Sequence, residues 1–484
     1  MAQFDLILVL PVVSLAAYGL LGLLLEPWLR GANRTLGFVT LLGLGMSGYS
    51  LAGLWRIVAA VGPQETAYGM VRIDAFGLLF SFVLLGVTAL SVLVSVTFLE
   101  REQADHPEFY PLTLFCLAGM FVMLHTTHLL LVLVGLEVFS LALYVMTGLT
   151  RRRERSIESA LKYFLLGAFS SGFLVYGMAL LYGATGSLDL RRLAAAAVSA
   201  PSPLLWIGMA LVLVGLAFKI GAVPFHHWVP DVYQGAPTNV AGFMAAATKT
   251  ATFAVLLRFL VGAFGDSTEV WMPIVTWLAI LTMTVANLVA LAQTDLKRLL
   301  AFSSIAHAGY LLVAVTCRPD DGIKAVLFYL AVYGLMTVGA FAVLGAVGRG
   351  DAEREWGYTL ADWAGLGWRR PALAAAMTLF LLSLAGIPPT GGFFGKYVIF
   401  LGAVRAEQYL LAIVLALNAT IAAYYYLRVL VYLYMRPSET EEPSLPISLA
   451  TTAVIVMASA GVLYLGIAPG RLLDVLSGLA RSLI

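Results

Sequence analysis

The chain has 484 residues, of which 61% are hydrophobic and 12% charged, with a formal net charge of +2. Soluble domains are about 25% charged and about 45–50% apolar, so this composition indicates a polytopic membrane protein. The small net charge gives no reason to expect a nucleic acid or an acidic substrate. Cys116 and Cys317 stand alone in apolar segments, which predicts neither a disulfide framework nor a zinc or cluster site. Nucleotide-binding glycine motifs are absent, so we expect no nucleotide or flavin on this chain.

Fourteen apolar segments are long enough to predict membrane-spanning helices, each of which needs about 20 residues. Segments four and five share the short polar break HTTH, and segment twelve is interrupted at GIPPTGG. The N-terminus lacks a basic leader and a cleavage site, so the first segment is expected to be retained. The predicted spans are 4–25, 36–59, 75–99, 112–125, 129–149, 159–182, 204–223, 236–264, 271–291, 299–316, 323–347, 371–404, 410–434 and 447–467.

The distribution of Lys and Arg among the short loops predicts the orientation of the chain. Cations concentrate in the loops that follow spans five, nine and eleven, all odd-numbered, and these loops therefore share one side. That side should be cytoplasmic, which places both termini on the periplasmic side. The cations concerned are the RRRER run at 151–155, then Lys297 and Arg298, and finally Arg349, Arg354, Arg369 and Arg370.

The segment 218–250, from FKIGAVPFHHW to ATKT, departs from the apolar pattern. Proline removes a backbone donor and clashes with the preceding turn, so the seventh helix should break near Pro224. A broken helix is tolerated in lipid only where protein or a water-filled cavity satisfies the freed backbone groups. Lys219 and Lys249 bound this segment, and a lysine at bilayer depth costs roughly 2.5–3.5 kcal/mol. Buried cations beside a helix break predict a hydrated path through the protein, which we interpret as a proton path.

A faint internal duplication accompanies this segment. A second proline-broken span with a nearby lysine occurs at Pro388, Pro389 and Lys396. Five spans separate the two breaks, an odd number, so the second copy should be inverted relative to the first. Interrupted helices at matching positions of two halves are a sequence indicator of a transport site.

Four ionisable residues are the main candidates for proton transfer: Glu137, Lys219, Lys249 and Lys396. Glu137 is the only acid in a long apolar run, and a carboxylate beside Lys219 would favour the charged form of the lysine while burial opposes it. The alternatives are structural. Glu137 could be a packing residue that is protonated or bonded to a serine, Lys249 could extend to the interface, and Lys396 could satisfy carbonyls freed by the two prolines.

Three further residues are weaker candidates. Lys162 lies about seven residues beyond the RRRER run, so a boundary lysine is an alternative. His226 follows Pro224 closely and could relay protons or cap the broken helix. His307 shares a helical face with Ser303 and Tyr310. These residues could form a hydrogen-bonded proton wire, or His307 could be a core histidine with satisfied hydrogen bonds. Structural roles are expected for Asn287, Asn418, Arg258 and Arg428.

Four long motifs carry a resemblance to a known family. PFHHWVPDVYQGAPT, ALKYFLLGAFSSGFLVYG, TDLKRLLAFSSIAHAGYLL and LAGIPPTGGFFGKY resemble the antiporter-like membrane subunits of respiratory complex I. VPDVYQGAPT is similar to the N-type (NuoN-type) members, whereas the L, M and Mrp relatives usually have an acidic residue before the alanine–proline pair. The resemblance runs from the fourth span to the thirteenth.

The resemblance implies an all-α integral membrane protein of about 14 transmembrane helices, with two inverted five-helix repeats and broken helices 7 and 12. The implied divisions are a three-helix segment at 1–108, repeats at 109–265 and 266–436, and a last helix at 437–484. Glu137 would pair with Lys219, Lys249 would be the central protonatable lysine, and Lys396 the terminal one. Lys162 and His226 would belong to the same hydrated axis.

The implied function is that of a proton-translocating subunit of NADH:quinone oxidoreductase, a translocase, in the bacterial inner membrane. NAD, FMN, iron–sulfur clusters and quinone are expected on partner subunits and no cofactor on this chain. The expected partners are the other antiporter-like and small membrane-arm subunits and the lipid bilayer, without nucleic acid. The alternative is a subunit of a Mrp-type cation/proton antiporter, which would function without redox partners.

Overall fold

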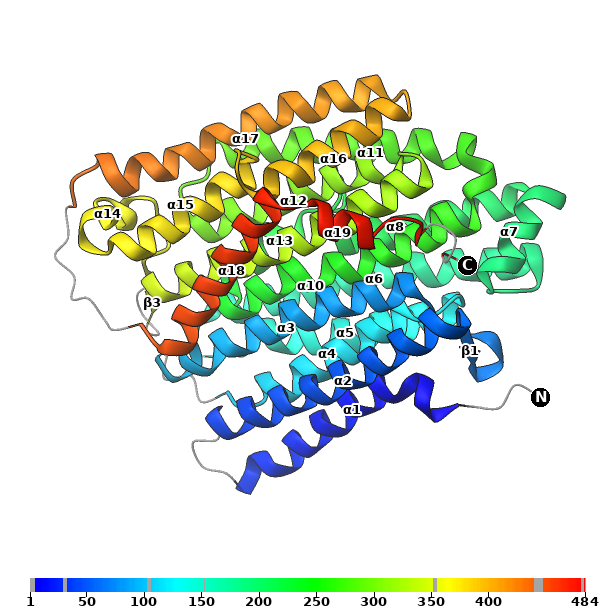
Figure 1. Ribbon diagram of the computed structural model, residues 1–484, viewed down its shortest axis with the longest axis horizontal. Coiled ribbons are helices and arrows are strands. Elements are labelled where there is room, and N and C mark those ends of the chain that lie inside the picture. The colour runs from blue at the N-terminus through cyan, green and yellow to red at the C-terminus, as the bar shows by residue number, and fades with distance from the viewer. Residues whose placement is uncertain are drawn as a thin grey trace.

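The computed structural model describes residues 5–28, 33–101, 106–151, 153–350, 355–438, 447–479 and 483, and they form an almost wholly helical bundle (Figure 1). Three residues used in the predictions, Phe4, Arg152 and Arg354, lie outside the described residues. The helices run roughly along the long axis of the molecule, from α1 and α2 on one flank to α17 on the other. Helix α18 crosses this bundle obliquely and contacts α3, α13 and α16.

The fourteen predicted spans correspond to helices of the structure. By length and composition, twelve helical segments of the described chain can cross a membrane, and α4 and the broken pair α15–α16 are shorter. The helices that form the spans are α1 (Leu6–Leu25), α2 (Asn33–Val61), α3 (Ala75–Arg101), α4 (Phe109–Leu124), α5 (Leu129–Thr147), α6 (Glu154–Thr185), α8 (Pro203–Ile220) with α9 (Trp228–Gly235), α10 (Thr238–Leu256), α11 (Thr268–Ala290), α12 (Leu296–Val315), α13 (Pro319–Val347), α15 (Pro371–Ala385) with α16 (Gly391–Arg405), α17 (Tyr409–Met435) and α18 (Leu449–Ile467).

The centre of the bundle is formed by three helices that are buried along almost their whole length, α10, α12 and α13. Because the hydrophobic effect does not drive association in lipid, helices there pack through close contact of small residues. Gly119 of α4 and Gly135 of α5 meet in this way, since an added Cβ on either would lie about 2.5 Å from the carbonyl oxygen of the other. Gly177 of α6 and Gly208 of α8 form a similar close contact.

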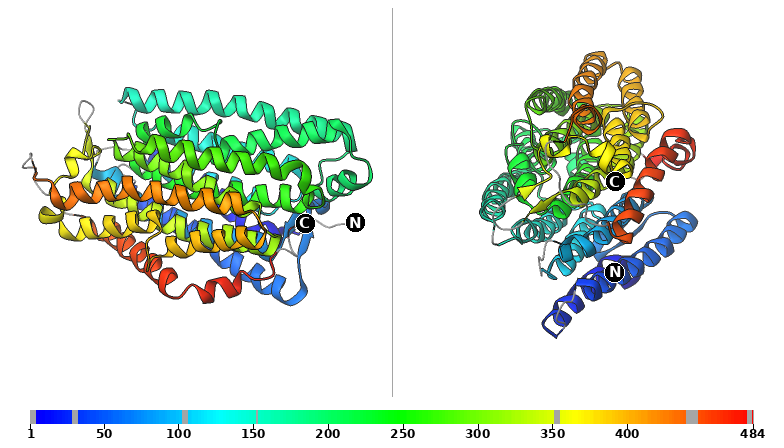
Figure 2. Two further views of the ribbon diagram at one scale, coloured as in Figure 1. Left: turned by 90° about the horizontal axis from the view of Figure 1, so that it is seen from above. Right: turned by 90° about the vertical axis from the view of Figure 1, so that its left-hand side faces the viewer.

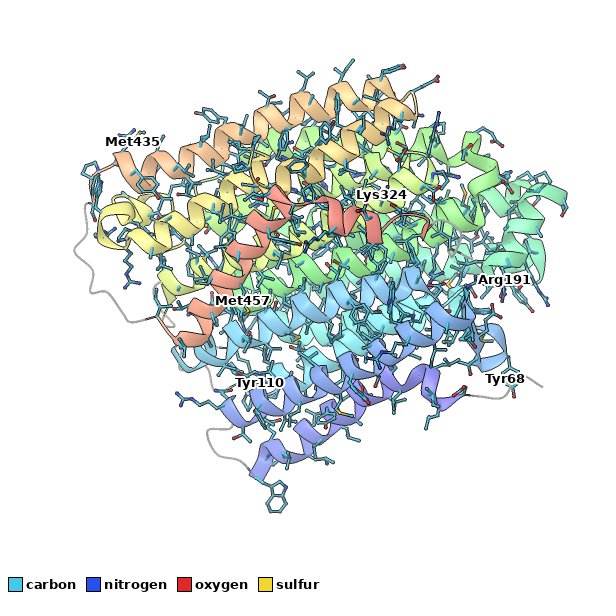
Figure 3. All side chains as sticks on the ribbon, viewed as in Figure 1. Tyr68, Tyr110, Arg191, Lys324, Met435 and Met457 are labelled. Carbon is cyan, nitrogen blue, oxygen red and sulfur yellow. The ribbon has the colours of Figure 1, made fainter. Side chains whose placement is uncertain are left out.

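One end of the bundle carries short elements that hydropathy did not predict. These are the hairpin β1 (Gln64–Thr66) and β2 (Val71–Ile73), and the amphipathic helix α7 (Leu190–Ser199). Arg191 of α7 donates a hydrogen bond to Glu65 of the hairpin, at 2.8 Å. Figure 3 shows Arg191 and Tyr68 together at this end, with Met435 of α17 at the opposite end.

Both ends of the described chain lie near this hairpin (Figure 2). The Asp5 backbone N–H donates to Thr66, and the Leu483 carbonyl accepts from Arg258, whose guanidinium also binds Asp74 just beyond the hairpin. Arg258 lies in the π-helical turn η3 (Leu257–Ala263) that ends the eighth span. The predicted structural role of Arg258 agrees with these contacts, which attach the hairpin and the C-terminus to the central helix.

The opposite end gathers the cation-rich loops. Lys162 at the start of α6 and Arg298 at the start of α12 both bind Asp231, and Thr359 pairs with Asp295 next to Arg298. The loops that follow spans five, nine and eleven therefore meet at one end, as the cation count predicted. Which side of the membrane that end faces stays a prediction.

Candidate functional site: a buried lysine series between two broken helices

Each broken helix ends its first half on a left-handed glycine. Gly221 caps α8 with φ of 75°, and Gly386 caps α15 with φ of 85°, conformations that favour glycine because it has no Cβ. The α8–α9 pair leaves the hairpin end and runs toward the cation-rich end, whereas α15–α16 runs the opposite way. The two breaks are therefore inverted copies, as the positions of the prolines predicted.

The carbonyls freed by each break receive donors from the half-helix that follows. Trp228, the first residue of α9, donates its indole N–H to the carbonyl of Phe218 at 3.0 Å. Lys396 of α16 donates to the carbonyls of Leu384 and Ala385, both at 2.9 Å. This is the internal satisfaction that a broken helix requires in lipid. Lys396 therefore has the structural role that was its alternative, because it satisfies carbonyls that the prolines free. This role does not exclude proton transfer.

Lys219 lies in the last turn of α8 and is buried. Its ammonium group donates to Ser140 at 2.7 Å and to the Tyr144 hydroxyl at 3.3 Å, both on α5. Aromatic rings surround the charge, with the centroids of Phe139 and Tyr163 at 5.4 and 5.6 Å from the nitrogen. Hydroxyl partners and ring faces compensate part of the lost hydration of the ammonium group.

Glu137 lies one turn from Ser140 on α5, but the expected ion pair with Lys219 is not formed. No ion pair within 4 Å joins these two residues, both of which the structure describes. Ser171 of α6 donates to the Glu137 carboxylate at 2.5 Å and holds it on that side, while Ser140 takes the lysine. The structure therefore holds the unpaired arrangement of these two groups.

Lys249 lies at the middle of α10, buried to 2% exposure. It donates a short hydrogen bond to Ser304 of α12, and Ser304 also accepts from the Tyr333 hydroxyl of α13 at 3.0 Å. The threonines around Lys249 bond to their own helix backbone instead. Lys249 thus binds a hydroxyl of α12 inside the bundle, so it does not extend to the membrane interface.

His307 follows one turn after Ser304 on α12 and is fully enclosed. Its two ring nitrogens meet the hydroxyls of Tyr329 at 2.5 Å and Tyr426 at 3.2 Å. Tyr329 lies on α13 and Tyr426 on α17, so the imidazole bridges two neighbouring helices. Ser303 binds Tyr426, as its predicted position on the same helical face allows.

Two of the weaker candidates lie at the edge of the series. Lys162 is 43% exposed at its side chain and pairs with Glu158 at 2.6 Å and Asp231 at 3.0 Å. His226 lies in the break between α8 and α9, with its ring centroid 4.5 Å from that of His227 and the two ring planes tilted by 33°. Lys219, Lys249, His307 and Lys396 are thus all buried, on α8, α10, α12 and α16, whereas Lys162 lies in a surface ion-pair cluster.

The residues of the second half that were expected to be structural hydrogen-bond to polar side chains or to backbone carbonyls. Asn287 contacts the hydroxyls of Tyr310 and Tyr425 and the side chain of Asn418. The ring centroid of Tyr310 is 4.9 Å from the Lys396 nitrogen. Arg428 binds the carbonyls at the end of α11. These contacts fix helices α11, α12 and α17 around the second half of the series.

One residue of this site, Ser304, was not predicted, and the burial of Lys297 outside the series was not predicted either. Ser304 is the shared partner of Lys249 and Tyr333, and its neighbour Ser303 was chosen because of helical spacing to His307. Lys297 was assigned only to loop orientation, but it is buried to 2% and donates to the carbonyls of Gln234 and Ala236. Lys297 lies beside Asp295 and Arg298 in the sequence, so its surroundings do not distinguish it from a loop cation.

Comparison with known proteins identifies the class of this fold and site. Residues 126–422 match the family described as "NADH:quinone oxidoreductase/Mrp antiporter, TM". The chain belongs to this family of antiporter-like membrane proteins. The range covers the helices that carry all seven candidate residues.

Individual relatives narrow the assignment to one group of that family. The chain is 42% identical to NADH-quinone oxidoreductase subunit N of Trichlorobacter lovleyi, over 97% of this chain and 96% of the relative. A chain of respiratory complex I from Thermus thermophilus with bound aureothin superposes with a TM-score of 0.80 at 38% identity, covering 96% of this chain and 99% of that one. The chain is a member of the subunit N group.

The Mrp complex from Dietzia sp. DQ12-45-1b shares the fold alone. One of its chains superposes with a TM-score of 0.83 at 23% identity, over 99% of this chain and 97% of that chain. At this identity the likeness to the Mrp complex shows a shared fold.

Proposed function

We propose that this chain is the N-type membrane-arm subunit of a proton-translocating NADH:quinone oxidoreductase. The observation that carries the proposal is the series of buried ionisable and hydroxyl groups, Lys219, Lys249, Ser304, His307 and Lys396, between two inverted helix breaks. Ionisable groups at bilayer depth are costly and usually mark ion pathways. The relatives named as subunit N support the assignment of the complex.

In this proposal protons move between protein groups while electrons move elsewhere in the complex. Hydroxyl groups can both donate and accept, so Ser140, Tyr144 and Ser304 can remain bonded to a lysine in either protonation state. A change at Glu137 would alter the charge that Lys219 carries, because an opposite charge nearby favours the ammonium form. NAD, FMN, iron–sulfur clusters and quinone belong to partner subunits, and the protein functions in a bacterial inner membrane with periplasmic termini.

The test is proton transport by the whole complex in inverted membranes that carry Lys249→Met. We expect the complex to assemble and oxidise NADH, with the ratio of protons moved to NADH oxidised falling by about half or more, since a positioned proton carrier contributes strongly to transfer. The matched control is Lys324→Met, because Lys324 is half-buried in the first turns of α13, outside the series. An assembled Lys249→Met complex with the wild-type ratio would show that the series is not a proton path.

A further inference from the structure

The half-helix α9 is held at three places: beside Lys219, at the Ser304 partner of Lys249, and in the ion-pair cluster of Asp231. It begins at the break beside Lys219, passes Ser304 in its middle, and ends at the cation-rich end of the bundle. None of the seven candidate proton carriers lies within α9. Its contacts indicate a mechanical role.

The first attachment joins α9 to the surroundings of Lys219. Trp228 donates to the carbonyl of Phe218, which immediately precedes Lys219 in the chain. The Trp228 ring also stacks on Tyr163, with centroids 4.6 Å apart and planes at 14°. Tyr163 is one of the rings that surround the Lys219 ammonium group. A change in the position of Lys219 therefore acts on the first turn of α9.

The second attachment joins α9 to the partner of Lys249. The Tyr233 hydroxyl lies 3.5 Å from Ser304, the hydroxyl that accepts a hydrogen bond from Lys249. This distance is at the limit of a hydrogen bond, so a shift of well under 1 Å makes or removes the contact. Tyr233 is 1% exposed, so water at the protein surface does not compete for its hydroxyl.

The third attachment is a pair of ion pairs on Asp231. Its carboxylate accepts from Arg298 of α12 at 2.7 Å and from Lys162 of α6 at 3.0 Å. Arg298 also binds the side chain of Gln234 one turn further along α9. Asp231 is thus joined to both repeats, and α12 is the helix that carries Ser304 and His307.

We propose that Asp231 is a positioning residue that fixes α9 against both repeats and so sets the contact between Tyr233 and Ser304. Through this contact a change at the Lys219 site alters the hydrogen bond of Lys249, without a direct bond between the two lysines. The inference rests on the proposed proton path and adds to it the element that couples its first two lysines. The physical basis is one rigid half-helix with attachments at both sites.

The experiment measures the ratio of protons moved to NADH oxidised in membranes that carry the whole complex with Asp231→Asn. The substitution keeps the shape and removes the charge, so both ion pairs are weakened. We expect the ratio to fall about twofold or more, in the range by which coupling residues act. Asp231→Glu should restore part of the ratio. A role in folding alone would change the amount of assembled complex and leave the ratio of the assembled complex unchanged.

The matched control is Asp321→Asn, which removes a comparable ion pair with Arg405 at the other end of the bundle. It should leave the ratio at the wild-type value. If Asp231→Asn prevents assembly, Tyr233→Phe serves as the second variant. It removes only the hydroxyl that contacts Ser304, and it should lower the ratio of protons moved to NADH oxidised. A wild-type ratio in either assembled variant overturns the inference. If the ratio is also normal in Lys249→Met, the proposed function has failed as well.

Discussion

At the scale of single residues, the buried lysines differ in the chemistry of their partners. Lys219 and Lys249 donate to hydroxyl groups, whereas Lys297 and Lys396 donate to backbone carbonyls. A carbonyl only accepts, and a neutral amine still has two N–H groups to offer. Lys396 can therefore lose a proton and keep both bonds to the break. A structural role and a proton-carrying role are compatible at this position.

Substitution of Lys396 by arginine separates these two roles. A guanidinium group can donate to the carbonyls of Leu384 and Ala385, but it does not release a proton in proteins. We therefore expect Lys396→Arg to preserve the amount of assembled complex and to lower the proton-to-NADH ratio by about twofold or more. Native gels and proton uptake in inverted membranes measure the two quantities.

The control for this substitution is Lys297→Arg, because Lys297 also binds carbonyls of a half-helix but belongs to no step of the proposed path. The proton-to-NADH ratio of Lys297→Arg should remain at the wild-type value. A normal ratio in assembled Lys396→Arg would contradict proton transfer through Lys396 and leave it with the structural role alone.

At the scale of elements, close helix contacts keep the lysine-binding hydroxyls in place. Helix α5 carries Ser140 and Tyr144, and it packs on α4 through Gly135 and Gly119. An added Cβ on Gly119 would lie 2.6 Å from the Gly135 carbonyl oxygen, which is backbone and cannot rotate away. The two helices would have to separate, and α5 would move relative to Lys219.

We therefore expect Gly119→Ala to reduce the yield of assembled complex and to lower its thermal unfolding midpoint. The matched control is Gly86→Ala on α3, where an added Cβ meets nothing within 4 Å. In a helix interior this change is favourable by roughly 0.5–1 kcal/mol, so the control should be neutral or slightly stabilising. Equal yields and midpoints for the two variants would show that the α4–α5 contact tolerates a wider spacing.

At the scale of the whole molecule, hydropathy and proline positions predicted much of the architecture. The fourteen spans, the two breaks and their inversion follow from local properties of the chain, namely apolar length and the missing N–H of proline. The partners of the buried groups could not be predicted in this way. Ser304 meets Lys249 across 55 positions, and Ser171 holds Glu137 away from Lys219, because these contacts depend on how helices pack.

The same distinction applies to elements at the ends of the bundle. Helix α7 is ten residues long and too short to be found by a search for spanning segments. The burial of Lys297 depends on the carbonyl end of α9 lying against it. The sequence therefore predicts the charged groups of the site and the carbonyls at the second break, whereas the contacts of Ser304 and of Lys297 depend on helix packing.

The whole series of charges also predicts which ion the molecule moves. Transporters with broken helices coordinate sodium through the carbonyls that the break exposes. Here the carbonyls of Phe218, Leu384 and Ala385 already accept hydrogen bonds from Trp228 and Lys396. A sodium ion would also meet the positive charge of the neighbouring lysines.

We therefore expect the proton-to-NADH ratio of the whole complex to be unchanged when sodium is replaced by choline at constant ionic strength. The measurement is proton uptake by inverted membranes in the two media, with NADH oxidation recorded in parallel. A ratio that falls without sodium and recovers on its addition would favour the Mrp-type alternative. Sodium binding at the second break would also require that the ion displace Lys396 from the carbonyls there. In that case the replacement of sodium by choline should change the proton-to-NADH ratio most strongly in Lys396→Met.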